Sequence, residues 1–195
     1  MISSALAQLR DLHILVRLEL SNILRRPLKR LYVSLSQLSM LLYNRRISFG
    51  DLILDRWERA SLYGFGSGSS VYDSVLVLGD VTIGDNCWIG PNVILDGSGA
   101  PLTVGNNTTI SAGVHIYTHS THLRDVDGDM SGVLTGPVNI GCHCYLGPSS
   151  IISLGTSISD HVVVGALSFV NGLNVPKWAR VYGIPAHIYS IKGDA

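Results

Sequence analysis

Residues 80–95 read DVTIGDNCWIGPNVIL, and within them the aliphatic residues Ile83, Ile89 and Leu95 stand six positions apart. A helix repeats its buried face every 3.6 residues and a half-exposed strand every two, so neither structure explains this spacing. Aliphatic or aromatic residues on the same step of six are Phe65, Val71, Val77, Val104, Ile110, Ile116, Ile140, Leu146, Ile152, Ile158, Val164 and Val170. Most of the chain is therefore built from repeated units of six residues.

Each unit also reserves positions for small residues. Gly or Ser often follows the aliphatic residue, as at Gly84 and Gly90, and a compact residue comes four positions after it, as at Cys87 and Cys144. A short strand and a corner fit such a unit, and three units close one triangular coil of about eighteen residues. Stacked coils pair their strands in parallel, so the sequence predicts a mainly β parallel β-helix of hexapeptide repeats, with both cysteines in its core.

The repeat is interrupted at two places. The register slips by three residues across 97–101, and it is lost after Thr118. It returns at Ile140 after a whole number of units, so we expect the loop 119–137 to leave the coil and rejoin it in register. An insertion into an otherwise smooth solenoid is where function is expected. This loop contains two histidines among Arg and Asp residues and is the predicted site.

Residues 1–46 are predicted to form a helical extension of two helices, the first of which Pro27 ends or kinks. Leucines of the second helix follow one seam at Leu28, Leu31, Leu35, Leu38 and Leu42. The extension contains eight Lys and Arg against two Asp and Glu, although the whole chain has zero net charge. The helices either cap the β-helix or lie on an anionic membrane surface. Capping is preferred because it requires no further partner.

Composition excludes several classes of protein. Charged residues make up only 14% of the chain and Gly occurs 21 times, which does not fit a disordered chain. The odd number of cysteines argues against a disulfide framework, and without a second Cys pair we expect no metal site. We also expect no signal peptide, no membrane span and no nucleic-acid partner. The expected location is cytoplasmic, and peripheral at the inner face of the membrane if residues 1–46 bind lipid.

The chain resembles the hexapeptide-repeat acyltransferases, most of all the sugar, lipopolysaccharide and capsule O-acetyltransferases. The resemblance rests on 80–86, 88–91, 95–99, 111–119 and 145–148. It implies a left-handed coil, a homotrimer, and acetyl-CoA in a groove between two subunits. The expected domains are a helical extension at 1–46, a connecting segment at 47–63, the β-helix at 64–190 with the loop 119–137, and a tail at 191–195.

The resemblance also implies site residues. In the part of the family with this Ile-Tyr-Thr-His run, the histidine after Thr is the base, which is His119 here. Other sugar acetyltransferases carry their histidine two residues later, at Thr121 of this chain, so His122 is the alternative. Asp96, one coil earlier, either orients the histidine or is only a turn residue, and the turn role is preferred. The implied CoA contacts are Tyr145, Pro148, Gly165, Ala166, Ser168 and Asn171.

The transfer of an acetyl group from a thioester to a hydroxyl requires a base for the hydroxyl proton, and an imidazole suits that role. No Ser or Cys nucleophile is needed, so we expect direct attack in a ternary complex. The expected function is acetyl transfer from acetyl-CoA to a hydroxyl of a sugar or envelope saccharide precursor, as in polysaccharide or lipopolysaccharide biosynthesis. The alternatives are an N-acetyltransferase acting on an amino sugar and a non-catalytic β-helix scaffold.

Overall fold

The structure, a computed structural model, describes residues 2–128 and 132–191. It divides into two compact units, Met1–Ile53 and Leu54–Ala195, and the second unit contains the repeats.

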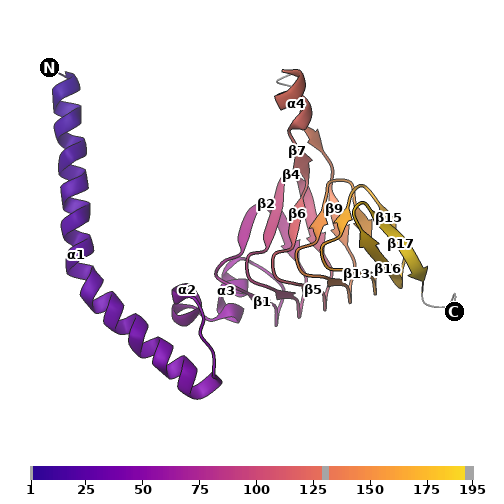
Figure 1. Ribbon diagram of the computed structural model, residues 1–195, viewed down its shortest axis with the longest axis horizontal. Helices are drawn as coiled ribbons and strands as arrows, with labels where there is room; N and C mark the ends of the chain where they lie inside the picture. Colours follow the sequence, from indigo (N-terminus) through magenta and orange to yellow (C-terminus); the bar gives the residue numbers. More distant parts are fainter. Residues whose placement is uncertain (1, 129–131, 192–195) are drawn as a thin grey trace. The chain divides into compact units, whose positions relative to one another are not determined.

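The second unit is a parallel β-helix whose short strands stack coil upon coil in three rows (Figure 1). The first row comprises β1 (Ser70–Val71), β3 (Trp88–Ile89), β5 (Thr109–Ile110), β10 (Tyr145–Leu146), β13 (Val163–Val164), β16 (Ala179–Gly183) and the antiparallel β17 (Ala186–Ile191). The long strands β2 (Leu76–Ile83) and β4 (Ile94–Val104) run round a corner and belong to both other rows. The second row continues with β6 (His115–Tyr117), β11 (Ile151–Ile152) and β14 (Phe169–Val170), and the third with β9 (Val138–Ile140), β12 (Ser157–Ile158) and β15 (Asn174–Val175). The predicted hexapeptide-repeat β-helix is confirmed.

The offsets between coils follow the repeat and its slip. Tyr145 pairs with Val163, eighteen residues on, as three units of six require. Across the slip the offset grows by three, so that Asp96 pairs with Tyr117. The inserted turn packs tightly on the coil before it, because a Cβ on Gly97 would lie 2.1 Å from the Asp80 carbonyl oxygen. The extra residues are therefore held in a fixed turn.

The side chains on the step of six form the core. Those with no exposed surface include Val71, Ile89, Leu95, Ile110, Ile116, Leu146, Ile152, Val164 and Val170. Cys87 and Cys144 are 2% and 3% exposed, which confirms their predicted place in the interior. Each buried aliphatic side chain contributes about 1.5–3 kcal/mol relative to exposure, so this column accounts for most of the driving force for folding. Val77 is the exception on the step and is only partly buried.

A short helix closes the first coil. Helix α3 (Arg56–Leu62) packs against β1, and its Arg59 side chain is buried. Nη1 of Arg59 donates to the Val71 carbonyl oxygen at 3.0 Å, and Nη2 donates to the Leu54 carbonyl oxygen at 3.2 Å. Nη2 also lies 3.5 Å from the Asp73 carboxylate. Arg59 therefore satisfies backbone acceptors that the coil leaves unpaired at its end.

Replacing Arg59 by methionine is expected to lower the free energy of unfolding by about 2 kcal/mol, because buried carbonyl oxygens lose their donors. Arg56→Met is the matched control, since the partly exposed guanidinium of Arg56 lies over the Tyr72 ring at 4.6 Å. That contact is worth less than about 1 kcal/mol. Denaturant unfolding followed by circular dichroism measures both variants. Equal losses in the two would contradict the capping role of Arg59.

The predicted second, separate helix in residues 1–46 is wrong, whereas the alternative that Pro27 kinks the helix without ending it fits the structure. Helix α1 (Ile2–Tyr43) is one helix with Pro27 inside it. Proline removes one backbone donor and crowds the preceding turn, and a long helix absorbs this by bending; α1 curves along its length in Figure 1. Helix α2 (Phe49–Ile53) follows, with the rings of Phe49 and Tyr32 edge to face at 6.0 Å. Among the described residues, no helix combines the length and hydropathy needed to cross a bilayer.

Candidate active site

The excursion after Thr118 is an arm built on two antiparallel strands. Strand β7 (His119–Ser120) pairs with β8 (Leu134–Thr135), and helix α4 (His122–Asp127) lies between them in the chain. Figure 1 shows the arm leaving the coil and pointing away from it. Because β7 starts the arm, its first residue is held by pairing to β8 and by the coil at once. The predicted base His119 thus sits on a rigid element rather than on the tip of a loop.

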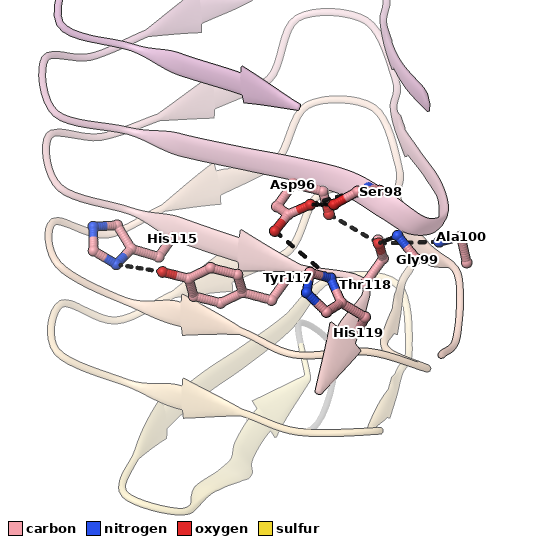
Figure 2. A network of polar contacts seen from close by, with 8 residues as sticks. All are labelled: Asp96, Ser98, Gly99, Ala100, His115, Tyr117, Thr118 and His119. Atoms are coloured by element: carbon pink, nitrogen blue, oxygen red, sulfur yellow. Dashed lines mark hydrogen bonds and ion pairs between the residues drawn. The ribbon is translucent and has the colours of Figure 1, made fainter. Parts of the chain in front are cut away.

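His119 faces the carboxylate of Asp96 on the preceding coil (Figure 2). Nδ1 of His119 lies 3.6 Å from Oδ2 of Asp96, and the two side chains are 30% and 7% exposed. Nδ1 is buried without a hydrogen-bond partner. The distance is slightly longer than a hydrogen bond, as is common for catalytic pairs before substrate binds. A carboxylate beside Nδ1 orients the ring so that Nε2 is left for a substrate proton.

The two carboxylate oxygens of Asp96 have different neighbours, which bear on the two roles that the sequence left open. Oδ1 accepts hydrogen bonds from the backbone N–H of Ser98, at 3.0 Å, and from the Ser98 hydroxyl, which makes Asp96 the turn residue that was preferred. Oδ2 faces His119. Hydrogen bonds therefore support the turn role, and the orienting role stays a prediction that the position of Oδ2 favours.

Thr118 fixes the inserted turn against the start of the arm. Its side chain is fully buried, and its hydroxyl donates to the Asp96 carbonyl oxygen at 2.9 Å. The Thr118 hydroxyl oxygen in turn accepts from the backbone N–H groups of Gly99 and Ala100, each at 3.2 Å. A Cβ on Gly99 would lie 2.4 Å from Cβ of His119, so this position has no room for a side chain. The turn therefore packs directly against His119 and requires glycine at position 99.

Tyr117 is a site residue that the sequence did not single out. It pairs with Asp96 in the strand register, and its hydroxyl lies 3.3 Å from Nδ1 of His115 (Figure 2). Burial raises the pKa of the Tyr117 hydroxyl, and the nearby Asp96 carboxylate raises it further. Tyr117 therefore stays neutral at physiological pH and acts as a hydrogen-bonding group. The sequence signal that could have identified Tyr117 was its place next to the buried Ile116, because neighbouring residues of a strand point to opposite faces.

His122 has different surroundings from His119. It begins helix α4, its side chain is exposed, and its Nδ1 lies 2.8 Å from the Ser120 hydroxyl. A hydroxyl partner on an exposed arm orients a ring less firmly than a buried carboxylate does. The geometry therefore favours His119 over His122 as the base.

Several predicted CoA contacts gather at one corner of the coil. Gly165 and Ala166 follow β13, and Pro148 takes the matching place one coil earlier, where its carbonyl oxygen accepts from the Leu167 N–H at 2.9 Å. Glycine precedes Pro148 because a Cβ there would lie 2.5 Å from the Ala166 nitrogen. Ser168 is 1% exposed, so this predicted contact offers almost no surface to a ligand. Pro148 and Ala166 are exposed at this corner and Gly165 is partly exposed, and we call these three residues the glycine ledge.

The remaining predicted contacts and the histidine lie elsewhere on the coil. Tyr145 is 44% exposed on the first row of strands. Asn171 is exposed and follows β14, at the corner between the second and third rows where the arm of His119 also departs. Gly165 belongs to the corner between the first and second rows. A single protomer thus keeps His119 and the glycine ledge on different corners.

The described residues provide neither a reactive cysteine nor a set of metal ligands. Burial raises the pKa of the thiols of Cys87 and Cys144, so both stay uncharged and neither is suited to nucleophilic attack. Among the described residues, no group of three His, Cys, Asp or Glu side chains could hold a metal ion.

A family model described as the hexapeptide repeat of succinyl-transferase matches residues 80–118 and 137–170. The unmatched interval between the two stretches coincides with the arm. The repeat inferred from the step of six and the repeat of this family are therefore the same.

Among curated proteins, Nodulation protein L of Rhizobium meliloti (strain 1021) is 40% identical over 111 residues, covering 56% of this chain and 58% of that protein. Galactoside O-acetyltransferase of Escherichia coli (strain K12) is 32% identical over 108 residues, covering 55% and 42%. The chain spans less than two thirds of the length of these relatives. A hexapeptide-repeat containing acetyltransferase of Vibrio cholerae O1 biovar eltor, solved with acetyl coenzyme A, has a TM-score of 0.60 and 26% identity over 89% of each chain.

Proposed function

The chain is a hexapeptide-repeat protein, and on that premise we propose that it is an acetyltransferase that moves the acetyl group of acetyl-CoA to a hydroxyl of a saccharide. The observation that carries the proposal is the pair of His119 and the buried Asp96 at the base of the arm. The names of two similar proteins support its two halves: the Vibrio enzyme was solved with acetyl-CoA, and the Escherichia enzyme is named for a galactoside O-acetyl transfer. A saccharide of the cell envelope, or its precursor, is the proposed acceptor class.

In the proposed reaction, Nε2 of His119 takes the proton of the acceptor hydroxyl as its oxygen attacks the thioester carbonyl carbon. The resulting oxyanion collapses, the carbon–sulfur bond breaks, and the CoA thiolate leaves. The imidazolium then returns its proton to the sulfur. Asp96 stabilises the imidazolium between these steps, since its carboxylate lies beside Nδ1. No covalent enzyme intermediate forms.

The proposed CoA site lies between two protomers of a homotrimer. His119 and the glycine ledge at Gly165 and Ala166 occupy different corners of one coil, so neither corner alone provides both a base and a CoA surface. Packing one β-helix beside another brings unlike corners together across a groove. We therefore place the acetyl group between His119 of one protomer and the ledge of its neighbour. A monomer by light scattering at concentrations that give full activity would contradict this arrangement.

Acetyl-CoA is expected to raise the melting temperature of the protein. A ligand at a hundred times its dissociation constant stabilises the native state by about 2.7 kcal/mol, which is roughly 5–10 °C for a chain of this size. Ala166→Asp is expected to abolish the shift, because it sets a carboxylate on the proposed ledge. Thr82→Asp, exposed on an early coil, is the matched control and keeps the shift. No shift in the unaltered protein would favour a non-catalytic scaffold.

The acceptor chemistry is tested by the release of free CoA thiol. Hexoses and amino hexoses that differ only at one position, hydroxyl against amino, are supplied in parallel. Faster release with the hydroxyl sugar supports O-acetyl transfer. Release only with the amino sugar would replace this proposal by N-acetyl transfer on the same site.

A further inference from the structure

The N-terminal unit presents an apolar face that its own residues leave open. Leu24, Leu28, Leu31, Leu38 and Leu42 of α1 are between 43% and 58% exposed. Together with the partly buried Leu35 they recur at steps of three and four, which places them in one stripe along the helix. Helix α2 contacts α1 at Tyr32 and leaves the stripe itself uncovered within the described part of this unit.

The apolar face is wider than a helix–helix seam. At 100° per residue, Ile23 and Leu41 lie on one side of the leucine stripe and Tyr32 on the other, so the face spans about half of the circumference. Ile23 and Leu41 are 70% and 82% exposed. A coiled coil with a second copy would bury only the narrower stripe and leave these flanking side chains in water. The width of the apolar face therefore favours contact with a lipid bilayer over contact with a partner helix.

The charges lie where a bilayer surface requires them. Arg25, Arg26, Lys29 and Arg30 occupy the half of the helix opposite the leucines, and Arg45 with Arg46 follows its end. The stretch 31–44 between these groups contains no charged residue and is about 20 Å long as a helix, too short to span a bilayer. Cations on both flanks of a short apolar helix match the negative potential of an anionic membrane surface.

We propose that residues 23–46 bind the surface of a bilayer that contains anionic lipid. The leucine face enters the boundary between head groups and acyl chains, and the six cations contact lipid phosphates. Tyr32 and Tyr43, exposed at either end of the uncharged stretch, suit the interface because each combines an apolar ring with a hydroxyl. The proposal goes beyond the acetyltransferase and does not depend on it. It develops the second of the two roles predicted for residues 1–46, the contact with a membrane surface.

The test is flotation of the full chain with two kinds of vesicle, phosphatidylcholine alone and an equal mixture with phosphatidylglycerol. Binding is expected only to the mixture and is expected to weaken with added salt. Arg25→Gln with Arg30→Gln removes the cations that border the apolar face on its two sides. At about 1 kcal/mol for each cation near the surface, the pair is expected to weaken binding roughly thirtyfold. Lys177→Gln with Arg180→Gln, two exposed cations of the β-helix, is the matched control and keeps wild-type binding.

A second pair of variants separates lipid from a second copy of the chain. Leu38 lies in the stripe, whereas Leu41 lies beside it and is the more exposed of the two. Aspartate at either position is expected to lower vesicle binding. If Leu38→Asp alone had an effect, and that effect were a loss of self-association by light scattering without vesicles, the face would belong to a helix–helix contact. Equal binding of the chain to both vesicles, or to neither, would also overturn the proposal.

Discussion

Replacing His119 by alanine is expected to lower kcat for acetyl transfer by about 10²–10⁴-fold, the contribution of a well-placed general base. The hydroxyl proton then has no acceptor at the moment of attack, and the thiolate has no donor when it leaves. The KM for acetyl-CoA is expected to change little, because the proposed CoA ledge lies on another corner of the coil. Steady-state release of CoA thiol with a saturating hydroxyl acceptor measures both constants.

His122→Ala is the matched control for this experiment. The His122 side chain is exposed and its ring contacts the Ser120 hydroxyl at 2.8 Å, so turnover is expected to stay close to wild type. Melting temperatures of the two variants are expected to agree, since both residues lie on the same arm. Turnover retained in both variants would refute an imidazole base, and loss in His122→Ala alone would transfer the role to that residue.

The fold was predictable because one spacing determines it. Residues such as Ile89, Leu95 and Ile110 are fully buried, and the step of six between aliphatic residues is enough to place them inside a coil. No comparable signal marks α3, whose few residues close the first coil through the buried guanidinium of Arg59. The predicted end of the first helix at Pro27 failed because local sequence does not show how long the helix is. A helix of 42 residues tolerates the hydrogen bond lost at proline and bends.

The neighbours of His119 were harder to predict than His119 itself. An offset of eighteen residues would set Asp96 beside Val114, far from the arm. The three extra residues of the turn move its partner to Tyr117, two positions before His119. The slip of three residues is visible in the sequence, but the packing of the turn around Gly97 and the hydrogen bonds of Thr118 are contacts between coils and leave no periodic trace.

Because the pairing of Asp96 with His119 arises from that turn, a variant that keeps the turn isolates the effect of the charge. Asp96→Asn meets this condition, since the amide oxygen still accepts from the Ser98 N–H that Oδ1 now binds. The amide nitrogen would then face Nδ1 of His119 in place of Oδ2. A donor at that position favours the tautomer whose proton is on Nε2, and that nitrogen is then unable to take a proton from the acceptor.

Asp96→Asn is therefore expected to lower kcat on the order of 100-fold with little change in either KM or melting temperature. The corresponding change in a Ser-His-Asp triad costs about 10⁴-fold, and the 30% exposure of His119 together with the 3.6 Å gap argues for the smaller figure. Asp85→Asn is the control for loss of a carboxylate that accepts a backbone hydrogen bond, since Oδ1 of Asp85 accepts from the Ser67 N–H of the preceding coil at 2.7 Å. If Asp96→Asn kept wild-type turnover, the carboxylate would serve the turn alone and His119 would work without an orienting partner. A loss of turnover matched by a fall in melting temperature would likewise make Asp96 structural, because the amide preserves every contact of the turn except the charge.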